Sequence, residues 1–161
     1  MTAVSRSAST AAGLALIIAP PVAVIVKMFV YPGWMMLIIL MISIPLILGY
    51  ALQVVIAARS MLRPNGVFST AAGAQRGIIA AWVTSVAVIL VACLLVDGGD
   101  DGSYGSAFTA LTGTSSTAAG ETLSTTLMLV SAAIWLASWI WLVVEWIVLG
   151  VRARRDARVA A

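Results

Sequence analysis

The chain has 161 residues, of which 62% are hydrophobic and 9% are charged, a composition far from that of soluble domains. It predicts an integral membrane protein whose apolar side chains face lipid. The sequence has no histidine and one cysteine, which excludes histidine-based metal sites, Cys-His nucleophilic pairs and disulfides within the chain. We therefore expect no catalytic residues, no metal and no cofactor, and we do not expect an enzyme.

Four apolar segments are each long enough to cross the roughly 30 Å hydrocarbon core of a bilayer as a helix. Their expected bounds are 12–31, 34–57, 77–96 and 124–150. Pro32-Gly33 predicts a tight turn between the first two, a polar loop at 58–76 joins the second to the third, and a loop rich in Gly, Ser and Thr at 97–123 precedes the fourth. The sequence predicts an all-α fold, a single domain of four transmembrane helices arranged as two antiparallel hairpins.

Prolines interrupt the first two predicted spans near their middles, at Pro20-Pro21 and at Pro45. A proline lacks the backbone N–H and frees a carbonyl one turn earlier in the helix. The freed carbonyls lie near residues 16, 17 and 41, and in lipid they need a donor from elsewhere in the protein. Broken helices at matched depth can line a solute path, but kinks are also ordinary in membrane bundles, and we favour this second interpretation.

The basic residues fall almost entirely on one side of this predicted topology. Lys27 alone lies towards the other side, whereas both termini and the 58–76 loop share eight arginines: Arg6, Arg59, Arg63, Arg76, Arg152, Arg154, Arg155 and Arg158. The positive-inside rule then places both termini in the cytoplasm, in a multi-pass protein of the plasma membrane, and the acidic 97–123 loop outside. Because topology accounts for the net charge of +3, no nucleic-acid partner is expected.

Two charged residues lie near the outer ends of the predicted spans. Lys27 lies four residues before the end of the first span, within snorkelling reach of the headgroups. Asp97 opens the run Asp-Gly-Gly-Asp-Asp-Gly, which lacks the alternating spacing of a calcium-binding EF-hand loop. We therefore expect a solvated acidic turn at Asp97 and no dedicated calcium site.

Small residues recur every four positions in two of the predicted spans. The row that enters the third span is Gly73, Gly77, Ala81 and Ser85, and the row in the first span is Ala11, Ala15, Ala19 and Ala23. Small residues at this spacing let helix backbones approach closely, which favours helix association in lipid. Rows of this kind also arise by chance in an alanine-rich chain, so both explanations stay open.

The fourth span carries polar residues at intervals of seven: Ser124, Ser131, Ser138, Glu145 and Arg152. Seven residues make nearly two helical turns, so this polar stripe is expected to face neighbouring helices. Gln53 of the second span matches Glu145 in depth, and Gln53 or an arginine is the expected partner if Glu145 is structural. If Glu145 is instead solvated, it becomes a proton or cation site, with Gln53 at the same depth and with Ser131 and Ser138 along the same stripe.

Two classes of function are compatible with these features. The first is a structural or accessory membrane protein that packs with itself as a homo-oligomer or with the subunits of a larger membrane complex. The second is a small channel or secondary carrier for a cation or small solute that uses Glu145. The tryptophan-rich fourth span and the lack of reactive groups favour the first class, with the lipid bilayer as the immediate surroundings.

Overall fold

The computed structural model of the protein describes residues 6–70, 74–98 and 102–159. Its elements are α1 (Arg6–Phe29), α2 (Trp34–Met41), α3 (Ser43–Ile56), η1 (Ala57–Met61), α4 (Val67–Thr70), α5 (Ala74–Leu94), β1 (Asp97–Gly98), β2 (Tyr104–Gly105), α6 (Ala107–Thr112) and α7 (Ala118–Val159). Here η1 is a single π-helical turn that continues α3, and β1 and β2 form a short antiparallel pair.

Four helices are long and apolar enough to cross a membrane: α1, the continuous segment Ser43–Met61, α5, and Ala118–Asp156 within α7. This confirms the prediction of a mostly helical, multi-pass membrane protein. The helices extend beyond the predicted bounds at several ends, since α1 begins at Arg6 and α7 continues to Val159.

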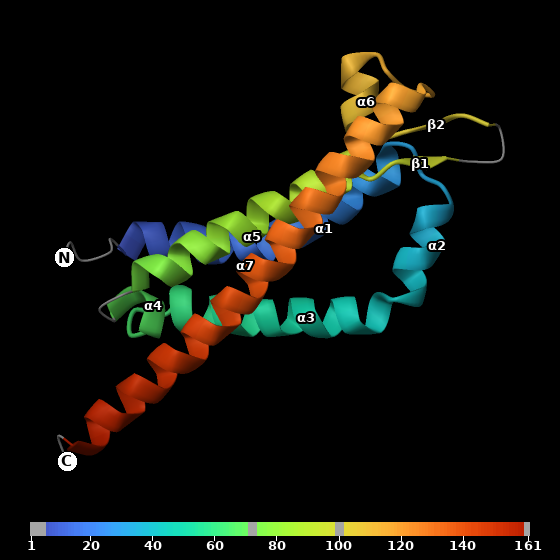
Figure 1. Ribbon diagram of the computed structural model, residues 1–161. Helices are drawn as coiled ribbons and strands as arrows, with labels where there is room; N and C mark the ends of the chain where they lie inside the picture. The colour runs from blue at the N-terminus through green and yellow to red at the C-terminus, as the bar shows by residue number, and fades with distance from the viewer. Residues whose placement is uncertain (1–5, 71–73, 99–101, 160–161) are drawn as a thin grey trace.

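The second span differs from its prediction of one helix over 34–57. The chain breaks at Ile42, where φ is −95° and ψ is 15°, and α2 runs across the end of the molecule before α3 begins (Figure 1). Pro45 accounts for the position of the break, because it has no N–H to bond the carbonyl of Met41. After the break, Pro45 lies in the first turn of α3, where no N–H is needed. Within this region Ser43–Met61 is the helical segment long and apolar enough to cross a membrane.

Helix α5 lies at the centre of the bundle and packs along both α1 and α7 (Figure 1). Helix α7 crosses α1 and α5 obliquely (Figure 1). The contacts of α1 with the α3 segment lie mainly at η1. The start of α1 and the end of α7 lie on one side of the molecule, and the β1–β2 pair lies on the other (Figure 1). The arginine-bearing ends of α1, α5 and α7 therefore lie on the same side of the molecule, with the end of α7 extending away from the others.

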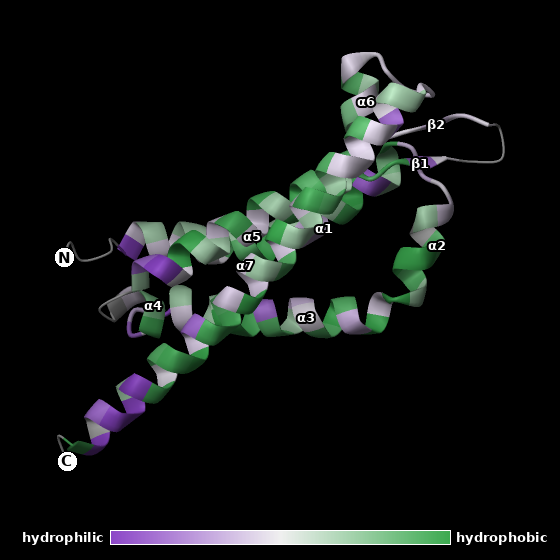
Figure 2. Ribbon diagram, in the orientation of Figure 1, coloured by the Kyte–Doolittle hydropathy of each residue, from purple (hydrophilic) through white to green (hydrophobic). Residues whose placement is uncertain are grey.

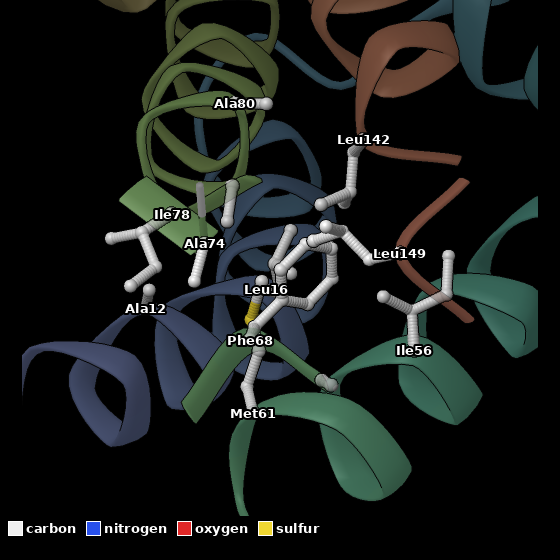
Figure 3. Close-up of a cluster of buried hydrophobic side chains, with 12 residues drawn as sticks. Ala12, Leu16, Ile56, Met61, Phe68, Ala74, Ile78, Ala80, Leu142 and Leu149 are labelled. Atoms are coloured by element: carbon white, nitrogen blue, oxygen red, sulfur yellow. The ribbon is translucent and has the colours of Figure 1, made fainter. Parts of the chain in front are cut away.

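A cluster of buried hydrophobic side chains lies towards the arginine-bearing end, where α4 and η1 join the long helices (Figure 3). Phe68 of α4 is fully buried among Leu16 of α1, Met61 of η1 and two leucines of α7, Leu142 and Leu149. Burying a side chain of this size stabilises the fold by about 1.5–3 kcal/mol. One short helix thereby links three of the long ones.

The two rows of small residues differ in how far they are buried. Gly77, Ala81 and Ser85 are buried in α5, and Gly73 lies outside the described residues. In α1 the row is buried only at Ala19 and Ala23, because towards Arg6 the buried face shifts by one position to Ala12 and Leu16.

Gly77 has a specific packing reason to lack a side chain. A Cβ at this position would collide with the ring of Phe68, which is itself fully buried and cannot move aside. Glycine lowers the stability of a helix by about 1 kcal/mol relative to alanine. The packing of Phe68 against Gly77 offsets this loss of helix stability. The close approach of α4 to α5 depends on it.

We predict that Gly77→Ala destabilises the protein by about 1–3 kcal/mol, because the added methyl group overpacks the Phe68 site. Gly150→Ala in α7 is the matched control, since nothing lies within 4 Å of a Cβ there. It should be neutral or stabilising by up to about 1 kcal/mol. The free energy of unfolding in mixed detergent measures both, and equal effects of the two substitutions would contradict the packing argument.

Candidate functional site

The polar stripe of α7 faces the bundle at its first three positions. Ser124, Ser131 and Ser138 are buried, whereas Glu145 is half-buried and Arg152 is exposed. Since α7 crosses α5 obliquely, the stripe leaves the interface as it approaches the arginine-bearing end. The structure therefore divides the stripe into a buried seam and an outward-facing remainder.

The buried part of the stripe forms hydrogen bonds to α5. The hydroxyl of Ser124 donates to the carbonyl of Leu94 at 2.7 Å, and the hydroxyl of Thr84 donates to that of Ser138 at 3.0 Å. Ser131, between them, lines an open groove of about 290 Å³ whose other lining residues are apolar, among them Trp82 and Ile134. These polar groups join two helices, and the groove beside them suits an apolar occupant.

Glu145 has its hydrogen bond within its own helix. The indole Nε1 of Trp141, one turn earlier, donates to Oε1 of Glu145 at 3.1 Å. Among the described residues the one salt bridge joins two other side chains, so no arginine pairs with Glu145 there. The structure does not bring Glu145 together with Gln53 either, because the amide of Gln53 bonds to α1.

Gln53 and Tyr50 of α3 satisfy the two carbonyls that the Pro20-Pro21 pair frees. The side-chain Nε2 of Gln53 donates to the carbonyl of Leu16 at 2.7 Å, and the hydroxyl of Tyr50 donates to that of Ile17 at 2.9 Å. Each acceptor lies four residues before a proline, where the helical donor is missing. The expected need for outside donors at residues 16 and 17 is therefore met by α3.

A buried ion pair closes the opposite end of the bundle. Nζ of Lys27 lies 3.3 Å from Oδ2 of Asp97, and these side chains are 3% and 2% exposed. Oδ2 has no hydrogen bond, so its close contact with Nζ is what compensates its burial. The prediction of a solvated turn was wrong at Asp97, and Asp100 and Asp101 lie outside the described residues. Lys27 likewise is buried against the chain and does not extend to the headgroups.

Both members of the pair also cap helix ends. Lys27 donates to the carbonyls of Tyr31 and Leu95, just beyond the C-terminal ends of α1 and α5, where a cation is favourable. Oδ1 of Asp97 accepts from the backbone N–H of Met35 in the first turn of α2, which has no side-chain cap of its own. The pair thereby joins α1, α2, α5 and β1.

Gly33 permits this junction. A Cβ on Gly33 would collide with the carbonyl of Gly98 and with Oδ1 of Asp97. The absence of a side chain at Gly33 thus lets β1 approach the start of α2.

The segment after β2 ties the same end to α7. Ser106 and Thr109 form a reciprocal capping box at the start of α6. The hydroxyl of Ser106 also lies 2.8 Å from that of Ser124, and both are buried. The loop predicted at 97–123 therefore contains the short helix α6 and is anchored to the first position of the α7 stripe.

The sequence did contain a signal for the ion pair. Lys27 is the only lysine, it lies among no other cations at its end of the molecule, and Asp97 follows the third span directly at the same predicted depth. Opposite charges at one boundary of two neighbouring spans are candidates for pairing. Taken separately, Lys27 predicts a snorkelling lysine and Asp97 predicts a solvated carboxylate. The pair follows only when the two residues are considered together.

Other potential reactive groups are sparse in the part of the chain that the structure describes. Cys93 is a free, half-buried thiol in α5. Within residues 6–70, 74–98 and 102–159, no group of three or more acidic or cysteine side chains is placed to hold a metal ion. The hydroxyl groups inside the helices donate either to other helices, as Tyr50 and Ser124 do, or to a carbonyl of their own helix, as Ser85 does.

No protein-family model, curated protein or solved structure matches the chain. What the protein does must therefore be inferred from its own residues and geometry.

A double-mutant cycle tests the role of Gln53. Gln53→Leu should destabilise the protein by about 1–3 kcal/mol, because it leaves the Leu16 carbonyl without a donor in an apolar environment. Pro20→Ala restores the N–H that reaches Leu16 within α1, so Gln53→Leu should cost less in that background.

Pro21→Ala is the matched control for this cycle, since it restores a donor for Ile17 and leaves Leu16 unchanged. Unfolding free energies in mixed detergent give the coupling for both cycles. Equal costs of Gln53→Leu in all three backgrounds would refute the assignment of Gln53 to the Leu16 carbonyl.

A second double-mutant cycle tests the ion pair, because the stability effects of substitutions at Lys27 and Asp97 should depend on each other. Lys27→Met or Asp97→Asn alone should cost about 3–5 kcal/mol, because each leaves a buried charge without its partner. The double variant Lys27→Met/Asp97→Asn contains neither charge and should be more stable than the Lys27→Met single variant. Thermal unfolding of the four proteins in detergent decides this, and strictly additive losses would contradict it.

Proposed function

We propose that the protein is a structural or accessory membrane protein that packs with itself or with the subunits of a larger membrane complex. The observation that supports this role is the use of its intramembrane polar groups. Gln53, Tyr50, Thr84 and Ser138 each bond to another part of the chain, which leaves them unavailable to a passing solute.

The exposed surface favours the same proposal. Most of the large apolar side chains of α2 and early α3 whose burial is described are exposed, among them Trp34, Leu40 and Leu48. Helix α2 has no polar face, and helices of this kind are normally buried in protein or in lipid. In a bilayer this surface can contact both lipid and apolar helices of a partner.

A small channel or carrier that uses Glu145 is the second candidate. What favours it is the position of this carboxylate within an apolar helix, half-buried and bonded only to Trp141 among the described residues. Intramembrane carboxylates often mark ion pathways. Against it, Gln53, Ser131 and Ser138 do not converge on Glu145, and the groove beside Ser131 is apolar.

Two substitutions at Glu145 separate the candidates. In the accessory role, Glu145→Gln retains an acceptor for Trp141 and should keep its stability within about 0.5 kcal/mol. Glu145→Leu leaves the indole N–H without a partner and should cost about 1 kcal/mol, because that bond is partly exposed. In the carrier role, both variants abolish transport, since neither an amide nor a leucine can bind and release a proton or cation.

The measurements are thermal stability of the purified protein and proton or cation flux into liposomes. Flux in the wild type that disappears in a stable Glu145→Gln variant would overturn the accessory role. A wild-type protein without flux, with stability lost only in Glu145→Leu, is the expected result.

We further propose that both termini face the cytoplasm and that the segment between α5 and α7 lies outside, in the plasma membrane. The support is the distribution of eight arginines and one lysine between the two ends. A reporter that is active only in the cytoplasm should give signal at the C-terminus and none when inserted at Gly113.

A further inference from the structure

Helix α7 is too long to be contained in a bilayer. Its 42 residues extend for about 63 Å, whereas a bilayer with its headgroups is about 40–45 Å thick. Leu149 is the last residue of α7 that the structure describes as buried, and the helix continues for about 15 Å beyond it to Val159; from Val151 on, every residue whose burial is described is exposed. Figure 2 shows that the hydrophilic residues of α7 gather in this final part, which extends away from the other helices.

The four arginines of this extension occupy one side of the helix. At 3.6 residues per turn, Arg152, Arg154, Arg155 and Arg158 fall within an arc of roughly 160°. Asp156 lies outside this arc, on the side that Ser138 and Leu149 turn towards the bundle. All four arginines are exposed, and no salt bridge to them is found among the described residues.

The basic side continues the lipid-facing side of α7. Val144, Val148 and Val151 are outward-facing and follow one another at intervals of four and three residues, and the same spacing leads next to Arg155 and Arg158. Such residues form a single ridge along a helix. Arg155 lies about 6 Å beyond Val151 along the axis, which is about the depth of the headgroup layer.

We propose that Arg152, Arg154, Arg155 and Arg158 form a binding surface for the phosphate groups of anionic phospholipids. A ridge that contacts acyl chains at Val151 brings its next residues to the headgroups of those same lipids. The guanidinium group matches a phosphate with two parallel hydrogen bonds, and none of these groups is neutralised by an ion pair within the described chain. The surface therefore selects lipids by charge at the boundary of α7.

Spin-labelled lipids test this proposal in the full-length protein. Reconstituted into phosphatidylcholine vesicles, the wild type should immobilise spin-labelled phosphatidylglycerol about fivefold or more over spin-labelled phosphatidylcholine. One arginine near an anionic surface contributes about 1 kcal/mol, which corresponds to this factor. The variant Arg154→Gln/Arg155→Gln/Arg158→Gln should approach equal retention of the two lipids, and 1 M salt should weaken the preference of the wild type.

Two further variants keep the test specific. Arg154→Lys/Arg155→Lys/Arg158→Lys retains the charge and should retain most of the preference. Arg6→Gln/Arg59→Gln/Arg76→Gln removes as much charge from the same end of the molecule and should leave the preference clearly measurable. Equal retention of both lipids by the wild type, an unchanged preference in the α7 glutamine variant, its loss in the lysine variant, or an equal loss in the two glutamine variants would each overturn the proposal.

Discussion

The structure depends on one constraint of the bilayer, which is that no water is present to bond a free backbone carbonyl. A broken helix therefore needs a donor from another part of the protein. At Pro20-Pro21 the chain remains helical, and Gln53 and Tyr50 supply the donors for Leu16 and Ile17. These two bonds fix the rotation and depth of α3 against α1, because a displacement of about an ångström would break them. At Pro45 the chain instead ends one helix and begins another.

The ends of the bundle are stabilised by different interactions. At one end Phe68 fills the space that Gly77 leaves, and an apolar cluster joins the short helices η1 and α4 to the four long helices α1, α3, α5 and α7. At the other end, Lys27 and Asp97 pair and cap three helix termini. A buried pair is costly to desolvate, and here the additional bonds to backbone groups offset that cost. Its contribution is specific positioning, because it fixes where α2 starts relative to α1 and α5.

The way in which the polar side chains are used bears on the function of the protein. The polar groups that a transport pathway would need are used to hold the helices together, and the outward surface is apolar along α2, α3 and much of α7. Glu145 and the arginines of α7 are the exceptions, since they are charged groups with little or no bonding to the rest of the chain. Such a surface fits the proposed role, in which the protein contacts lipid and packs with itself or with other membrane proteins.

The sequence alone determined the four apolar helices, the uneven distribution of arginine and the positions of two freed carbonyls, because hydrophobicity and the missing proline N–H are local properties. It did not determine that α2 separates from α3, nor which donors reach Leu16 and Ile17. Likewise, the Lys27–Asp97 pair joins residues 70 positions apart, and Glu145 proved to bond Trp141 where Gln53 or an arginine was expected. Only the tertiary structure decided these partners, since helix rotation and crossing angle select which side chains meet.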